Sequence, residues 1–324
     1  MFTAKEITVL VNRSIEELTL PDFPPHLYAP IRYILSLGGK RLRPVLSLMS
    51  ANLFTEDIYK ILPTALSIEL FHNFTLVHDD IMDEAPLRRK RPSVHKRWDT
   101  NIALLSGDAL SILAYQKLQE SAENLIPRLL KEFNEIALQV CEGQQLDMDY
   151  ETLKDISLDD YITMIRLKTA ALISGAMKTG AIAAGAIDED IALLYEAGTF
   201  LGIAFQIQDD YLDVYGNKET FGKTSGGDIL NNKKTFLLVS ALEKASGETK
   251  RKLDQLLLQP DADPEKKISL IKNIYNRLEI PRETIRAIRD YTEKALSGIN
   301  KTSVANSRKT PLKDLIQDLL GRQS

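Results

Sequence analysis

The stretch LPTALSIELFHNFTLVHDDIMD, residues 62–83, decides the fold class. Its apolar residues recur at steps of three and four, beginning with Leu62, Ala65 and Leu66, which is the spacing of one helix face. The same spacing recurs along almost the whole chain, and no segment shows a sustained alternation of Val, Ile and Thr. We therefore expect an all-α protein.

Proline and glycine residues punctuate this helical pattern. The segments between them have helical lengths, and about ten to fourteen helices would fit the chain. No linker rich in Ser, Gly or Pro separates two halves of the sequence. We therefore expect residues 1–324 to form one all-α domain.

Composition and charge exclude several classes of protein. The 41 basic and 45 acidic residues, with a pI near 5.7, argue against a nucleic-acid binder held by bulk charge. Cys141 is the only cysteine, which excludes an intrachain disulfide and a thiolate metal cage. The N-terminus lacks a signal-peptide layout, and Lys178 interrupts the most apolar stretch, residues 169–187. We expect a cytoplasmic protein without a stable membrane anchor.

The pattern D-D-x-x-D occurs twice, at Asp79–Asp83 and at Asp209–Asp213. On a helix the first and last acids of each motif lie about 6 Å apart on one face and repel by roughly 2–3 kcal/mol at an effective dielectric near 20. A solvated acidic face is the alternative for a single such motif. Here the flanking residues are apolar, so the carboxylates need a cation, and oxygen ligands of this kind suit Mg²⁺ or Mn²⁺.

A helical wheel extends both acidic faces. His72 and Thr75 share the stripe of Asp79 and Asp83, and Gln206 shares the face of the second motif. Two such helices facing each other would form a cavity with acids on opposite walls.

Glu69 and His72 also spell E-x-x-H, the ligand spacing of helical-bundle di-iron proteins. That class of site needs a second E-x-x-H, which the sequence lacks. A satisfied core histidine is the other alternative for His72.

Clusters of basic residues accompany the acids. Arg88 to Arg91 follow the first motif, GGKRLRP occupies residues 38–44, and Lys223 lies in the glycine-rich GKTSGGDI. Each cluster alone could be a solvated face. Glycine-rich turns with Lys and Arg suit phosphate oxygens, as does a metal held by aspartates, although the spacing of a P-loop is absent. The sequence therefore predicts a polyphosphate ligand.

Five blocks follow one another along the chain: GGKRLRP, HDDIMD with LRR and RPSVH, KT, FQIQDDYLD, and GKTSGGDI with KKT. In this order and spacing, from residue 31 to residue 238, they resemble the trans-isoprenyl diphosphate synthase (polyprenyl synthetase) family. The resemblance implies a prenyltransferase, usually a homodimer, whose core helices surround a deep cavity.

The resemblance also implies roles for individual residues. The direct ligands of about three Mg²⁺ ions on an allylic diphosphate would be Asp79, Asp83 and Asp209. The supporting acids would be Asp80, Asp210 and Asp213. The residues that hold the allylic diphosphate would be Arg88, Lys168 with Thr169, Gln206, Lys223 and Lys233. The pocket for isopentenyl diphosphate would be formed by Lys40, Arg43, His72 and Arg89.

The reaction implied is ionisation of the allylic diphosphate, attack by the double bond of isopentenyl diphosphate, and loss of a proton. In this family bulky residues before the first aspartate close the floor of the cavity, which here are Phe74 and Thr75, with Phe71 one turn deeper. We expect geranylgeranyl diphosphate as the product, and farnesyl diphosphate is the alternative.

Two other classes remain as alternatives. A terpene cyclase would share the fold, but the second D-D-x-x-D and GGKRLRP argue against it. A non-catalytic partner subunit of another synthase would commonly have lost an acidic motif, and both motifs are intact here.

Overall fold

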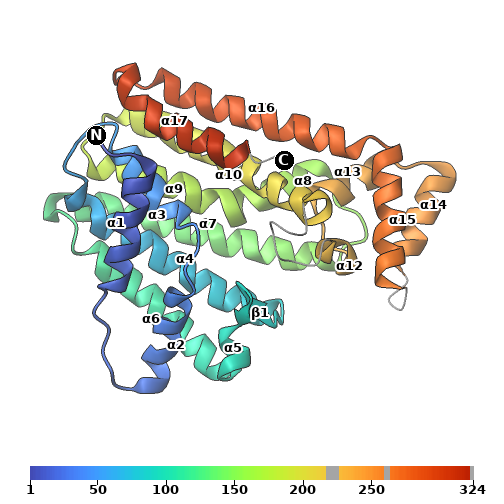
Figure 1. Cartoon of the computed structure of the whole chain (residues 1–324), viewed down its shortest axis with the longest axis horizontal. Helices are drawn as coiled ribbons and strands as arrows, with labels where there is room; N and C mark the ends of the chain where they lie inside the picture. Colours follow the sequence, from blue (N-terminus) through green and yellow to red (C-terminus); the bar gives the residue numbers. More distant parts are fainter. Residues whose placement is uncertain (217–225, 259–262, 322–324) are drawn as a thin grey trace. The chain divides into compact units, whose positions relative to one another are not determined.

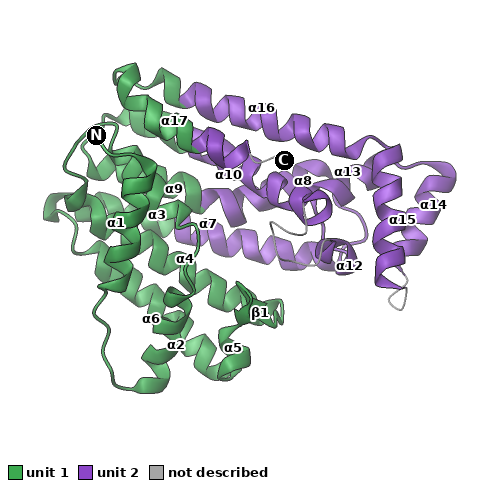
Figure 2. Cartoon of the chain, viewed as in Figure 1, with its two compact units in different colours: residues 1–135, 172–195, 299–315 green, residues 136–171, 196–298, 316–324 purple. Residues whose placement is uncertain are grey.

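The computed structural model describes residues 1–216, 226–258 and 263–321. These residues are helical apart from short connections and one antiparallel two-stranded hairpin, which confirms the all-α expectation (Figure 1). The backbone contacts divide the chain into two compact units (Figure 2). Unit 1 comprises residues 1–135, 172–195 and 299–315, and unit 2 comprises residues 136–171, 196–298 and 316–324.

Unit 1 contains the N-terminal helices and the hairpin. Its elements are α1 (Ala4–Glu16), α2 (Pro25–Ser36), α3 (Leu42–Ala51), η1 (Ile58–Ile61), α4 (Leu62–Met82), β1 (Leu87–Arg88), β2 (Arg91–Pro92), α5 (Val94–Arg97), α6 (Thr100–Leu118), η2 (Glu123–Leu125) and α9 (Ala171–Ala183). Besides α9, whose first residue Ala171 falls in unit 2, four helices contribute residues to both units: α7 (Ile126–Thr152), α10 (Asp188–Tyr215), α16 (Ile280–Lys301) and α17 (Asn306–Leu320).

Unit 2 contains the remaining helices. They are α8 (Leu158–Ile165), the π-helical turn η3 (Arg166–Ala170), α12 (Gly227–Leu230), α13 (Phe236–Lys244), α14 (Gly247–Leu257) and α15 (Pro264–Arg277). Across the described residues there are sixteen α-helices, more than the ten to fourteen expected from the sequence. The difference arises partly because α5 and α12 are single turns of four residues, too short to show a periodic pattern.

Side-chain caps fix where several helices begin. Thr3 and Ser157 each form a capping box with the acid three residues later, so backbone donors at the starts of α1 and α8 are satisfied locally. Asp99 and Thr235 accept a backbone N–H at the starts of α6 and α13.

The centre of unit 1 is α4, which packs along α6 and also contacts α2 and α3. Much of its length is buried, including Ala65, Ile68, Leu70 and Phe71. This burial on several sides explains why its apolar pattern is wider than a single stripe. The C-terminal end of the same helix carries the first acidic motif.

Helices α3 and α9 of unit 1 approach each other closely. A β-carbon on Gly180 would lie 2.0 Å from the carbonyl oxygen of Ser47, so only glycine fits there. The hydroxyl of Ser50 donates to the carbonyl oxygen of Met177 at 2.7 Å. Together these contacts fix α3, which begins within the basic GGKRLRP segment, against the core of the unit.

Unit 2 has two apolar clusters. One joins α13, α14 and α15 through residues such as Leu237, Leu253 and Ile271. The other joins α8, α10 and α13 through residues such as Tyr161 and Ile207. The second cluster surrounds the part of α10 that carries the second acidic motif.

Among the described helices, α10 alone is long and apolar enough to cross a membrane by length and composition. Its most apolar window has a mean hydropathy of 1.3, and 56% of that window is buried inside the protein. Burial of this extent is also what a core helix shows.

Candidate active site

The first acidic motif lies where α4 ends. The helix stops at Met82 with Asp83 as its C-cap, still in a helical conformation, and the backbone N–H of Asp83 donates to the carbonyl oxygen of Asp79 at 2.9 Å. Asp79 and Asp83 therefore lie one turn apart on one face, as the sequence predicted. Asp79 is partly buried and Asp83 is exposed.

The middle acid of this motif points into the protein. Asp80 is fully buried and accepts from Nε of Arg88 at 3.0 and 3.2 Å, with a further contact from Nη2. Burial raises the pKa of Asp80, and the Arg88 guanidinium opposes that rise. Arg88 lies in the hairpin β1–β2. This arginine, which was predicted to hold an allylic diphosphate, therefore also forms a salt bridge with Asp80 near the C-terminal end of α4.

The basic GGKRLRP segment makes a turn with unusual backbone angles. Gly38, Gly39 and Arg41 have φ values of +75°, +124° and +47°. A β-carbon on Gly39 would lie 2.5 Å from Cζ of Arg89, so the Arg89 guanidinium rests directly on this glycine. The turn brings Lys40 to the exposed surface.

Three residues of the predicted isopentenyl diphosphate pocket have described contacts within unit 1. Arg43 Nη1 lies 3.0 Å from Nε2 of His72. Burial, followed by the charges of Arg43 and Arg89, lowers the pKa of His72 well below its usual 6.5. This lowered pKa disfavours a positive charge on the imidazole beside these arginines.

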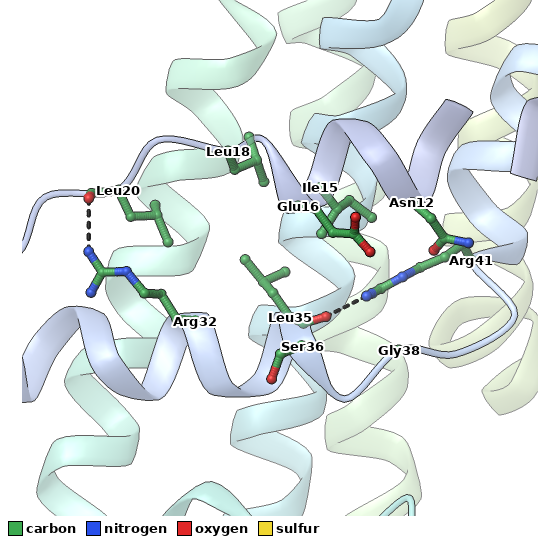
Figure 3. Close-up of a pocket in the computed structure, with 10 residues that line it drawn as sticks. All are labelled: Asn12, Ile15, Glu16, Leu18, Leu20, Arg32, Leu35, Ser36, Gly38 and Arg41. Carbon is green, nitrogen blue, oxygen red and sulfur yellow. Dashed lines mark hydrogen bonds between the residues drawn. The ribbon is translucent and has the colours of Figure 1, made fainter. Parts of the chain in front are cut away.

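Arg41 has a different environment from its basic neighbours. Its guanidinium is buried, and Nη1 bonds to Oε1 of Glu69 at 2.6 Å while Nη2 bonds to the carbonyl oxygen of Leu35 at 2.5 Å. Arg41 also lines a pocket of about 460 Å³ in unit 1, in which its side chain reaches Leu35 (Figure 3). Glu69 therefore forms a salt bridge and does not have the open carboxylate that a di-iron site would need.

The residues predicted to form the cavity floor belong to an aromatic cluster in unit 1. The ring centroid of Phe71 lies 5.2 Å from that of Phe74 and 5.4 Å from that of Phe133. Phe133 also contacts Tyr115 of α6, at 4.9 Å. The Thr75 hydroxyl donates to the carbonyl oxygen of His72 at 2.8 Å. Edge-on contacts of this kind hold the rings in defined positions.

The second acidic motif, on the unit 2 part of α10, repeats the arrangement of the first. Asp209 is exposed and Asp213 is partly buried, whereas Asp210 is only 4% exposed. Asp210 accepts from the Tyr161 hydroxyl at 2.6 Å and from the backbone N–H of Phe236 at 2.9 Å. Burial raises the pKa of Asp210 to about 6, against the opposing effect of these hydrogen bonds.

Asp213 is tied to the start of α12. Its Oδ2 accepts from the backbone N–H of Asp228 at 3.0 Å, and its carbonyl oxygen accepts from the N–H of Gly226 at 2.8 Å. The backbone N–H of Lys233 donates to the carbonyl oxygen of Asp228 at 2.9 Å. The predicted ligand Lys223 lies outside the described residues.

Lys168 and Thr169 lie in the π-helical turn η3. Lys168 Nζ bonds to Asp147 of α7 at 2.5 Å, and the Thr169 hydroxyl bonds to Gln206 at 2.9 Å. Gln206 in turn donates to Asp210 at 2.9 Å. Thr169 and Gln206 are therefore joined to the second motif through Asp210, whereas Lys168 is joined to α7 through Asp147. Both sets of contacts start from the π-helical turn, and such turns are frequent at functional sites.

The donor set of each motif fits a magnesium ion bound together with a ligand. Within the described ranges, no group of three or more His, Cys, Asp or Glu side chains forms a closed metal cage. Mg²⁺ usually keeps several waters and takes one or two protein carboxylates plus phosphate oxygens. The outer acids Asp79 and Asp83, and likewise Asp209 and Asp213, supply two carboxylates in each motif.

Several residues of this region were not predicted from the sequence. They are Arg41, Asn73, Asp147 and Tyr161, and Glu69 was considered only as an iron ligand. Their partners lie 4 to 49 residues away in the chain, and most of these pairings arise from tertiary packing.

The family model described as polyprenyl synthetase matches residues 24–274. A geranylgeranyl diphosphate synthase of Methanosarcina mazei is 40% identical over 237 residues, which is 72% of this chain and 73% of the relative. A short chain isoprenyl diphosphate synthase of Methanothermobacter thermautotrophicus is 37% identical over 268 residues, 82% and 80% of the two chains. A crystal structure of a geranylgeranyl pyrophosphate synthase superposes with a TM-score of 0.95 at 41% identity and covers 100% of both chains.

Proposed function

Because the chain belongs to the polyprenyl synthetase family, we propose that it condenses isopentenyl diphosphate with allylic diphosphates to give geranylgeranyl diphosphate. The observation that carries this product assignment is the 40% identity to a relative named geranylgeranyl diphosphate synthase. The protein is a prenyltransferase of isoprenoid biosynthesis. The allylic substrates that we propose are dimethylallyl, geranyl and farnesyl diphosphate.

We propose that the outer acids of both motifs bind the Mg²⁺ that accompanies the allylic diphosphate. Mg²⁺ would neutralise charge that develops on the departing pyrophosphate. Lys168 and Gln206, which bond to Asp147 and to Asp210, would orient that diphosphate, and we extend the same role to Arg88, Lys223 and Lys233. The positive charges of Lys168, Arg88, Lys223 and Lys233 would stabilise the leaving group as the carbon–oxygen bond breaks, and the Gln206 amide would donate a hydrogen bond to it.

Isopentenyl diphosphate would bind at Lys40, Arg43, His72 and Arg89. The support for this assignment is that the arginines surround His72 within unit 1, which suits recognition of a multiply charged anion. The double bond of this substrate would attack the allylic cation, and the proton released would pass to the pyrophosphate. No covalent bond to the protein is required.

The test is direct. The purified protein is incubated with labelled isopentenyl diphosphate, each allylic substrate and Mg²⁺, and the products are sized after hydrolysis. We expect a twenty-carbon product. A fifteen-carbon product would replace the proposal with farnesyl diphosphate synthesis, and no product in any combination would favour a non-catalytic partner subunit.

Two variants test the metal ligands. Asp79→Ala and Asp209→Ala should keep the fold, because neither side chain is fully buried, but should lose condensation. Chelation of the metal should abolish activity in the wild type, and Mg²⁺ should restore it. Wild-type turnover in either variant would contradict the assignment.

The homodimer and the cytoplasmic location expected from the sequence also remain proposals. Sedimentation of the purified protein measures the first, and fractionation of cells measures the second.

A further inference from the structure

The buried pair Arg41–Glu69 connects the basic turn to α4 without belonging to the predicted substrate contacts. We propose that Glu69 is a positioning residue for isopentenyl diphosphate, acting through Arg41 on the turn that carries Lys40 and leads into Arg43 at the start of α3. This inference rests on the proposed function for the identity of the ligand. The geometry that carries it lies entirely in unit 1.

The first observation is the backbone of Arg41. Its φ of +47° is left-handed, a conformation that is uncommon and strained for a residue other than glycine. Such a conformation persists only where surrounding contacts hold it. Here the two arms of the guanidinium provide those contacts, one to Oε1 of Glu69 at 2.6 Å and one to the carbonyl oxygen of Leu35 at 2.5 Å.

The second observation is that Glu69 is itself fixed. The side chain is 2% exposed, and its Oε1 also accepts from Nδ2 of Asn73 at 3.1 Å. The same amide donates to the carbonyl oxygen of Glu69 at 2.8 Å. A planar arginine that bonds on two sides to fixed acceptors has little freedom to move, so the turn around it is held in one shape.

The third observation is a second tether to α4. Arg43 lies two residues after Arg41 and touches His72, which lies three residues after Glu69 on α4. The pair Arg41–Glu69 therefore fastens the turn to α4, and the pair Arg43–His72 fastens the first turn of α3 to the same helix. Arg43 and His72 belong to the proposed substrate pocket, whereas Arg41 and Glu69 are buried.

The charges near the turn are consistent with separate roles for the buried pair Arg41–Glu69 and the pair Arg43–His72. His72 faces Arg41, Arg43, Arg88 and Arg89, and Glu69 is the acid that acts on Arg89 against the repulsion of Arg41 and Arg88. Glu69 thus offsets part of the repulsion among arginines that must lie close together. An anion such as a diphosphate would supply further compensation when it binds.

The experiment measures steady-state kinetics with each substrate varied separately. Arg41→Lys keeps the positive charge but replaces the planar two-armed guanidinium with a single ammonium group on a flexible stem, and Glu69→Ala removes the carboxylate that Arg41 bonds to. Each should raise KM for isopentenyl diphosphate by about tenfold, the usual effect of losing a charge-assisted hydrogen bond, while KM for the allylic substrate stays within about twofold. A residue that only stabilised the fold would not separate the two KM values.

A conservative variant sharpens the test. In the described part of the chain Oε2 of Glu69 has no hydrogen-bond partner, so Glu69→Gln can keep both contacts at Oε1. It should raise KM for isopentenyl diphosphate less than Glu69→Ala does, because the hydrogen bonds at Oε1 remain while the negative charge is lost. Asp190→Asn is the control, because Asp190 is equally buried at 2% exposure in unit 1 but bonds to Ser303. It should leave both KM values unchanged.

If Glu69→Ala does not fold, the double variant Arg41→Met with Glu69→Leu removes both buried charges at similar volume. An unchanged KM for isopentenyl diphosphate in any folded variant lacking the pair would overturn the inference. Failure of both Glu69→Ala and the double variant to fold would assign the pair a structural role only. An inactive wild type would contradict the proposed function instead, and calorimetric binding of isopentenyl diphosphate to wild type and Arg41→Lys would then decide the inference.

Discussion

The guanidinium of Arg89 occupies the space beside Gly39 where any other residue would place its β-carbon, 2.5 Å from Cζ. The side chain of Arg89 therefore packs directly on the backbone of Gly39, 50 residues earlier in the sequence. The contact depends on the absence of a side chain at Gly39, and this dependence can be tested.

Gly39→Ala should displace Arg89 and raise KM for isopentenyl diphosphate several-fold. Its φ of +124° also makes alanine unfavourable, with an expected loss of about 1 kcal/mol or more in the free energy of unfolding. Gly38→Ala is the matched control, because its φ of +75° is also left-handed but, apart from its chain neighbours, no described residue has an atom within 4 Å of its β-carbon. Equal KM values for the two variants would show that contact with Arg89 does not matter.

A second prediction concerns the π-helical turn that contains Lys168. A β-carbon on Gly143 would lie 2.1 Å from the backbone nitrogen of Lys168, which backbone atoms cannot accommodate without a shift. Gly143→Ala should lower the free energy of unfolding by about 1–3 kcal/mol and raise KM for the allylic substrate. Gly247→Ala, at a left-handed glycine with open space, should lower stability without changing either KM.

The aromatic cluster leads to a prediction about product length. Phe71 is 3% exposed and lies between Phe74 and Phe133, so Phe71→Ala should open space and shift the product toward longer chains. The expected loss of stability is about 3–5 kcal/mol. Leu53→Ala, at a residue buried to 1% exposure outside the cluster, is the control for a buried truncation. An unchanged product ladder in a folded Phe71→Ala protein would rule out Phe71 as the floor.

His72 predicts a specific pH dependence of stability. Its pKa in the folded protein is well below 6.5, because burial and the charges of Arg43 and Arg89 disfavour protonation. The unfolded chain therefore binds the proton more readily, and stability should fall as the pH decreases below 6.5, by at most about 1.4 kcal/mol per pH unit. The free energy of unfolding, measured with denaturant between about pH 7.5 and 5, should change less per pH unit in His72→Gln than in the wild type. Identical slopes would contradict the assignment of a depressed pKa.

Local periodicity predicted the helical class and the alignment of Asp79 with Asp83, because both depend on spacing within one helix. It did not predict that Asp80 and Asp210 are buried. Their burial depends on Arg88 of the hairpin and on Tyr161 of α8, and neither position can be derived from the motif itself.

The role of Glu69 was missed for a related reason. Its spacing from His72 is typical of di-iron proteins, whereas its actual partner is Arg41, 28 residues earlier. Arg41 was not distinguished from the basic residues beside it, since nothing in GGKRLRP indicates that the middle cation turns inward. The left-handed backbone that turns it appears only in the structure.

The burial of the middle acid in each D-D-x-x-D predicts which aspartates a duplicated copy of this chain would lose first. Asp80 and Asp210 are buried and bonded to Arg88, Tyr161 and Gln206, whereas their outer neighbours bind the metal under our proposal. A duplicated chain freed from catalysis would still have to fold, so its outer aspartates should drift first while the central one persists. In a non-catalytic partner subunit that arose in this way, a central aspartate without its outer neighbours would show where the metal-binding motif had been.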